Sequence, residues 1–165
     1  MTVLYDILEG PLGPLLAAGD GAALQRLTLP EGDDPAAPAP GWRRAPDAFA
    51  GLRRALSAYF AGEARAFDIP LRPQGTTFQL TVWRALQDIP YGTTRSYGEI
   101  ARAIGAPTAS RAVGAANGRN PIPILIPCHR VIGAQGALTG FGGGLSRKAF
   151  LLRLEGATSE QPTLL

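Results

Sequence analysis

The stretch "SYGEIARAIGAPTASRAVGAANG", residues 96–118, contains two short helical patterns separated by the tripeptide "GAP". We expect one helix from about Ser96 to Ile104 and a second from about Thr108 to Asn117. Glycine and proline between them favour a sharp turn over one continuous helix. Two short helices around such a turn have the proportions of a helix-turn-helix, whose second helix faces a nucleic acid. The stretch therefore predicts this motif.

The predicted second helix is unusually bare, because nearly every side chain after Arg111 is small. Small side chains allow a helix to pack tightly inside a protein, which is one interpretation. They also allow the helix backbone to approach DNA with little sequence preference, since few side chains reach the base edges. Arg111 would then enter the base stack at the place that a nucleotide has left. Both interpretations stay open.

The segments around this motif are also mostly helical. A helical pattern covers residues 74–88, and a last helix is expected to begin at Ser146 as its N-cap and to end at Gly156. Glycines at 133, 136, 140 and 142–144 predict a hairpin and a loop whose backbone a ligand can approach closely.

The first seventy residues have a different pattern. Three apolar stretches, "VLYDIL", "LGPLLAAG" and "ALQRLTLP", alternate with turns and predict a small antiparallel sheet. Residues 31–44 are rich in proline and alanine and predict a loop. A helix with Asp47 as its N-cap and Gly62 beyond its end is expected to pack on this sheet.

These patterns predict an α+β protein with two lobes. The small N-terminal lobe of sheet and helix covers residues 1–70. The mostly helical C-terminal lobe covers residues 75–156, and residues 157–165 form a tail. With 45% apolar and 18% charged residues, the composition is ordinary for a globular protein.

The net charge of +3 is unevenly distributed. Residues 1–71 hold six Arg against nine acidic residues, whereas residues 72–155 hold nine Arg and one Lys against three acidic residues. The basic half is a candidate surface for a polyanion, and an ordinary solvated face is the alternative.

Several classes of protein have no support in the sequence. One cysteine cannot form an internal disulfide, and no secretory signal pattern is present, so we expect a cytoplasmic protein. No apolar run is long enough to span a membrane. Structural zinc typically takes four Cys or His ligands, and the chain has two such residues, so no metal is expected.

Those two residues, Cys128 and His129, are adjacent in "IPILIPCHRVIG", residues 122–133. A thiol with a pKa of about 8.5 is mostly protonated at neutral pH and needs a nearby base to become a nucleophile. We expect a buried strand to end here, with one water relaying the proton between Cys128 and His129. Glu155, in the last turn of the final helix, is the candidate carboxylate that orients the imidazole. An inert buried cysteine beside a hydrogen-bonded core histidine is the alternative.

The segment from about Thr76 to Gly156 closely resembles the O6-alkylguanine-DNA alkyltransferases. The resemblance rests on "SYGEIARAIGAPTASRAVGAANGR", "NPIPILIPCHRVIG" and "LTGFGGGLSRKAFLLRLEG". It implies a ribonuclease-H-like N-terminal lobe and a winged helix-turn-helix C-terminal lobe. It further implies direct transfer of an alkyl group from O6 of guanine, and less readily from O4 of thymine, in duplex DNA.

The resemblance also implies roles for the catalytic residues. Cys128 accepts the alkyl group irreversibly, His129 takes the thiol proton through water, Glu155 orients His129, and Asn120 ties the active-site loop together. Each molecule would therefore repair one lesion. No cofactor is implied, and the metal ligands that some relatives carry in the N-terminal lobe are missing.

Contacts with DNA and with the flipped base follow from the same resemblance. Tyr97 would donate a hydrogen bond to the flipped base, and Arg111 would fill its place in the stack, with the protein in the minor groove. The remaining DNA contacts are expected from Thr108, Ser110, Ala112 and Arg130. The base pocket is expected from Val131, Phe141, Gly142 and Gly143, where Phe141 replaces a common tyrosine and Gly142 a serine of some relatives.

Two other functions remain in competition. A lesion sensor would flip damaged bases without chemistry, although the cysteine is replaced in such relatives. A thiol hydrolase or redox-sensing protein would use the same Cys, His and Glu but leave the bare helix and the basic lobe unexplained. We expect a monomer. Cooperative assembly on DNA, the range of alkyl groups and the choice between guanine and thymine lesions are not decided by the sequence.

Overall fold

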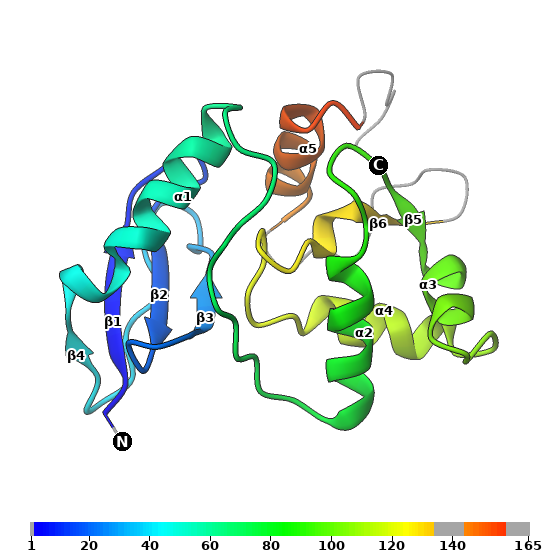
Figure 1. The fold of residues 1–165 in the computed structure, drawn as a ribbon, viewed down its shortest axis with the longest axis horizontal. Helices are drawn as coiled ribbons and strands as arrows, with labels where there is room; N and C mark the ends of the chain where they lie inside the picture. The colour runs from blue at the N-terminus through cyan, green and yellow to red at the C-terminus, as the bar shows by residue number, and fades with distance from the viewer. Residues whose placement is uncertain (1, 134–143, 158–165) are drawn as a thin grey trace. The chain divides into compact units, whose positions relative to one another are not determined.

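The computed structural model describes residues 2–133 and 144–157. The chain divides into two compact units, Met1–Gln74 and Gly75–Leu165, which we call the N-terminal unit and the C-terminal unit (Figure 1).

A four-stranded sheet forms the base of the N-terminal unit. Its strands, in the spatial order β3-β2-β1-β4, are β1 (Leu4–Leu8), β2 (Leu15–Gly19), β3 (Leu24–Thr28) and β4 (Arg43–Arg44). The three predicted antiparallel strands are confirmed, with Leu4 opposite Gly19 in the first pair. The fourth strand lies inside the segment predicted as a loop and runs parallel to β1. The backbone N–H of Arg43 donates to Val3, and the Arg44 side chain pairs with buried Asp6, which holds this segment on the sheet edge.

The predicted helix of this unit begins differently from expectation. A 3-10 turn, η1 (Pro46–Phe49), leads into α1 (Ala50–Phe60). Asp47 lies inside the turn and makes no capping bond, so the prediction that it is the N-cap is wrong. The proline at the start of the turn sets the helical backbone in place of a side-chain cap. Gly62, with φ +76°, follows the helix end as predicted.

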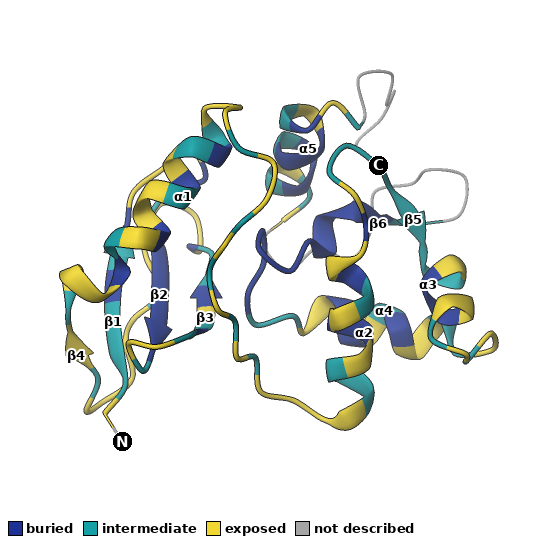
Figure 2. Cartoon of the chain, viewed as in Figure 1, coloured by how far each residue is buried: buried dark blue, intermediate teal, exposed yellow. Residues whose placement is uncertain are grey.

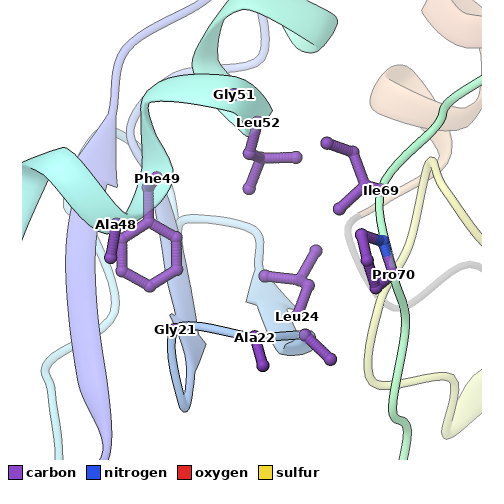
Figure 3. A pocket seen from close by; sticks show the side chains of 10 residues that line it. Gly21, Ala22, Leu24, Ala48, Phe49, Gly51, Leu52, Ile69 and Pro70 are labelled. Atoms are coloured by element: carbon purple, nitrogen blue, oxygen red, sulfur yellow. The ribbon is translucent and has the colours of Figure 1, made fainter.

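The N-terminal unit also contains a small apolar cavity of about 140 Å³ (Figure 3). Its walls come from the turn before β3, the start of α1, and the Ile69–Pro70 segment. Figure 3 shows Phe49, Leu52 and Leu24 around this space. No titratable side chain lines it, so it offers no acid or base for chemistry.

The C-terminal unit is mostly helical. Its elements are α2 (Thr77–Gln87), β5 (Arg95–Ser96), α3 (Tyr97–Ala103), α4 (Ser110–Gly118), η2 (Cys128–Arg130), β6 (Val131–Ile132) and α5 (Leu145–Leu154). Capping boxes start two of the helices, from Thr76 to Gln79 and from Ser96 to Glu99, and these bonds satisfy N–H groups that a helix start leaves open. Between α3 and α4, Gly105 adopts φ +78°, which the turn requires and glycine tolerates. The predicted helix-turn-helix is confirmed, with α3 packed against α4 (Figure 1).

Two local predictions in this unit are wrong. Residues 122–127 are buried, as Figure 2 shows, but they form turns and not a strand. Ile124 adopts φ +77°, which no strand residue does. The second error concerns α5, whose N-cap is Gly144 and not Ser146. The glycine hairpin and loop fall largely on residues 134–143, outside the described residues.

Candidate active site

The turn that carries Cys128 is held by the side chain of Asn120. Its Nδ2 donates to the carbonyl of Ile126 at 2.7 Å, and its Oδ1 accepts from the N–H of Ile122 at 3.0 Å. The N–H of Ile126 donates in turn to the carbonyl of Ile122 at 2.9 Å. These bonds satisfy backbone groups that an apolar turn has no water to satisfy. The prediction that Asn120 ties this loop together therefore has a concrete geometry.

Cys128 is the first residue of η2, and 5% of its surface is exposed. Burial raises the pKa of its thiol to about 11, against the opposing effects of the Asn120 hydrogen bond and the Lys148 charge. At pH 7 about one molecule in 10⁴ would then carry the thiolate. The resting thiol is protonated, so its reaction requires a base.

A candidate base, His129, lies next to it in the chain. His129 is fully buried, and its Nε2 is 2.8 Å from Oε2 of Glu155, the C-cap residue of α5. Burial lowers the pKa of His129, although Glu155 acts in the opposite direction. A neutral imidazole whose Nε2–H donates to Glu155 leaves Nδ1 as an acceptor. His129 Nδ1 has no hydrogen-bond partner and is free to accept a proton.

Arg130 completes this cluster and does not reach outward. Its Nε and Nη2 donate to the two oxygens of Glu155 at 2.8 and 2.9 Å, and its Nη1 donates to the carbonyl of Ile89 at 2.8 Å. Its guanidinium also lies 5.7 Å from the centre of the Tyr91 ring. The prediction that Arg130 contacts DNA is corrected here, because the side chain is buried and donates to three acceptors inside the unit. The bidentate pair instead fixes the carboxylate that orients His129.

Lys148, in α5, is a second buried cation near the thiol. Its Nζ donates to the carbonyl of Val131 at 2.6 Å, and its side chain is fully buried. Burial lowers its pKa to about 8, and the charge of a Cys128 thiolate acts in the opposite direction. A positive charge here stabilises the thiolate relative to the thiol.

Helix α4 presents its bare side to the surface. Arg111, Ala115 and Gly118, which share one helical face, are exposed, as is Ala112. Its opposite face, with Val113, Ala116 and Asn117, is buried. The small residues of the exposed face therefore do not pack inside the protein, which favours close approach of a partner.

The other predicted DNA contacts lie around this helix. Thr108 is exposed just before it, and Ser110 is half-buried at its first turn. Tyr97 starts α3, and its ring lies beside Gly114, where a Cβ would stand 3.7 Å from the ring. Of the predicted base pocket, Val131 is buried in β6. Phe141, Gly142 and Gly143 lie outside the described residues.

Two family models match the chain. One is described as "6-O-methylguanine DNA methyltransferase, DNA binding domain" and matches residues 77–157. The other is described as "6-O-methylguanine DNA methyltransferase, ribonuclease-like domain" and matches residues 3–73. The chain belongs to the 6-O-methylguanine DNA methyltransferase family. The family resemblance and the two-lobe α+β fold predicted from the sequence are confirmed.

Individual members of this methyltransferase family are similar over nearly the whole chain. A Methanosarcina acetivorans protein named methylated-DNA–protein-cysteine methyltransferase is 54% identical over 153 residues, which cover 93% of this chain and 98% of the relative. The crystal structure of Mycobacterium tuberculosis O6-methylguanine methyltransferase matches with a TM-score of 0.86 and 52% identity, covering 98% of this chain and 97% of that one. The structure of Mycobacterium tuberculosis OGT in complex with DNA matches with a TM-score of 0.87 and 54% identity over 93% of both chains.

Sequence reasoning missed two residues of this site, Asn117 and Lys148, and it missed the inward direction of the Arg130 side chain. Lys148 had a usable signal, because the chain's single lysine lies three residues before the core residue Leu151 on the same helix.

Within the described residues, no helix is long and apolar enough to cross a membrane, and no cluster of three His, Cys, Asp or Glu side chains is placed to bind a metal.

Proposed function

We propose that this methyltransferase removes the methyl group from O6-methylguanine in duplex DNA and retains it on Cys128. The observation that carries the proposal is the buried cluster around the thiol, in which His129 has one nitrogen committed to Glu155 and the other without a partner. Its family membership supports the reaction type, and a homologue has been crystallised with DNA.

The proposed reaction is a displacement at carbon. His129 Nδ1 takes the thiol proton, through one water, and the sulfur electron pair attacks the methyl carbon. The bond between that carbon and O6 breaks, and its electron pair passes to the base. O6-methylguanine carries no proton on N1, whereas guanine does, so the proton lost by the thiol balances the proton gained by the product. Tyr97 is the proposed donor that helps the base to accept this charge.

A thioether is a stable product, and the described part of the site holds no group placed to remove the methyl from sulfur. We therefore propose that each molecule reacts once. Burial of Cys128 requires that the lesion be brought to it, which extrusion of the base from the duplex achieves at a cost of a few kcal/mol. The exposed, bare face of α4 is the proposed contact with the minor groove, with Arg111 in the vacated position.

Several finer features belong to the same proposal. O4-alkylthymine would react less readily than O6-alkylguanine, and the protein would act as a monomer in the cytoplasm. A reducing compartment suits a protein whose activity depends on one unoxidised thiol.

The test is a count of repaired bases per protein molecule. A known amount of protein is mixed with an excess of duplex containing O6-methylguanine, and both the repaired base and the intact protein mass are measured. We expect one repaired base per molecule and a gain of one methyl group on the peptide that contains Cys128. The Cys128→Ala variant should repair nothing. Several repaired bases per molecule, or repair without a modified Cys128, would overturn the proposal.

A further inference from the structure

Two buried side-chain atoms in the described part of the chain have no hydrogen-bond partner. Both belong to neighbours of Cys128: one residue follows it in the chain, and the other donates a hydrogen bond to its carbonyl. One is His129 Nδ1, whose role in the proposed reaction is clear. The other is Oδ1 of Asn117, in the last turn of α4, to which the proposed reaction gives no role. A buried acceptor without a donor is unfavourable, and a leucine would fill a similar volume without leaving one.

We propose that Asn117 is a specificity-determining residue, whose Oδ1 accepts a hydrogen bond from the exocyclic amine of the extruded guanine. The inference rests on the proposed function, because it concerns the base that this function delivers to Cys128.

A hydrogen bond to the Cys128 carbonyl orients the side-chain amide of Asn117. Asn117 is 2% exposed, and its Nδ2 donates to the carbonyl of Cys128 at 3.4 Å. Only the NH₂ group of the amide can donate to a carbonyl, so the oxygen is directed away from it. Oxygen and nitrogen share one carbon atom, so Oδ1 lies beside the backbone of the residue that carries the thiol.

The nearby backbone acceptors are already engaged. The carbonyl of Cys128 accepts from the N–H of Val131 as well as from Asn117, which uses both of its lone pairs. The carbonyl of Val131 accepts from Lys148. The exocyclic NH₂ group of a guanine has two hydrogens to place. Asn117 Oδ1 is an acceptor with no competing donor at this position.

The chemistry of the lesion identifies the donor. O6-alkylguanine has lost its N1 proton, so its exocyclic amine is the donor that remains on its pairing edge. O4-alkylthymine has no amine there. A hydrogen bond from guanine to Asn117 would thus favour guanine lesions over thymine lesions, which the catalytic cluster alone does not distinguish.

The test compares two lesions that differ only in this amine, O6-methylguanine and O6-methylhypoxanthine, in otherwise identical duplexes. Single-turnover rates of methyl transfer to Cys128 are measured for the natural protein and for Asn117→Leu. We expect the variant to slow transfer from O6-methylguanine by roughly 3- to 10-fold, as for the loss of one hydrogen bond, and to leave transfer from O6-methylhypoxanthine unchanged. The Cys128 carbonyl keeps the Val131 N–H in this variant, so it is not left unpaired.

Three controls separate this role from others. The ratio of the two rates within one preparation does not depend on the folded fraction, and Asn117→Ala gives a second variant should the leucine protein fold poorly. Arg119→Gln, at the exposed C-cap of α4, should alter both rates by the same factor.

Equal slowing of methyl transfer from both lesions by Asn117→Leu would overturn the inference and indicate a purely structural role or a bound water shared with His129. Unchanged rates on both lesions would also overturn it. Failure of the natural protein to transfer methyl from either lesion would instead refute the proposed function.

Discussion

Replacement of Glu155 by glutamine tests the buried cluster most directly, because this carboxylate accepts hydrogen bonds from both His129 and Arg130. Its two oxygens accept from His129 Nε2 at 2.8 Å and from Arg130 Nε and Nη2 at 2.8 and 2.9 Å. Glutamine keeps one oxygen and turns the other into an NH₂ group that faces a donor. The change removes no volume, so its effects come from charge and hydrogen bonding.

The magnitude follows from burial. Removing one partner of a buried ion pair costs about 3–5 kcal/mol, since the guanidinium of Arg130 is left unpaired. For a chain of this size, each kcal/mol lowers the melting temperature by roughly 2–4 °C, so we expect a fall of about 6–20 °C. Because the remaining amide oxygen pairs with the Arg130 cation, we expect His129 to face the NH₂ group and to lose the acceptor that selects its tautomer. Base catalysis is typically worth about 10²–10⁴ in rate, and methyl transfer by Glu155→Gln should slow by an amount in that range.

A double variant separates stability from chemistry. Arg130→Met together with Glu155→Gln removes the unpaired cation, and we expect the melting temperature to recover most of the loss. Transfer should stay roughly tenfold slower than in the natural protein, because a neutral amide stabilises the imidazolium less well than a carboxylate does. Thermal melts and single-turnover rates on the same preparations measure both quantities. A Glu155→Gln protein with natural stability and rate, or a double variant with full activity, would refute the reasoning.

Further predictions concern the thiol and the DNA-facing helix. Methylation of Cys128 adds volume at a buried position and should destabilise the protein by about 1–3 kcal/mol, so a melt that shifts upward after reaction contradicts it. Because burial raises the pKa of Cys128 to about 11, its labelling by iodoacetamide without DNA should increase about tenfold per pH unit from neutrality to about pH 10; a plateau near pH 8 would show a more acidic thiol. Arg111→Ala should weaken binding to duplex DNA and leave this labelling unchanged, and a loss of labelling would assign Arg111 a role at the thiol. Binding of DNA should weaken with added salt in proportion to the phosphates contacted, and a flat response would exclude the basic residues from the interface.

Local sequence signals predicted the helix-turn-helix well. Its two helices depend on a capping box at Ser96 and on a turn at Gly105, and these effects act within a few residues. Prediction was poorer for the apolar run before Cys128, because an apolar run is compatible with a buried strand, helix or turn. Its turn geometry depends on the Asn120 side chain. The short β4 was missed because its hydrogen bonds come from β1, about forty residues earlier.

The sequence by itself determined the order of the three antiparallel strands and the main helices, and it determined that one thiol and one imidazole stand together with Glu155 as their candidate partner. These features depend on residue type and short-range spacing. Only the tertiary structure decided that Arg130 faces inward, that Lys148 lies buried near the thiol, and that Asn117 touches the carbonyl of Cys128. It also decided the direction of the Cys128 and His129 pKa shifts. The hydrogen bonds of Arg130 join residues 25 to 41 positions apart, and such separations leave no periodic signal in the chain.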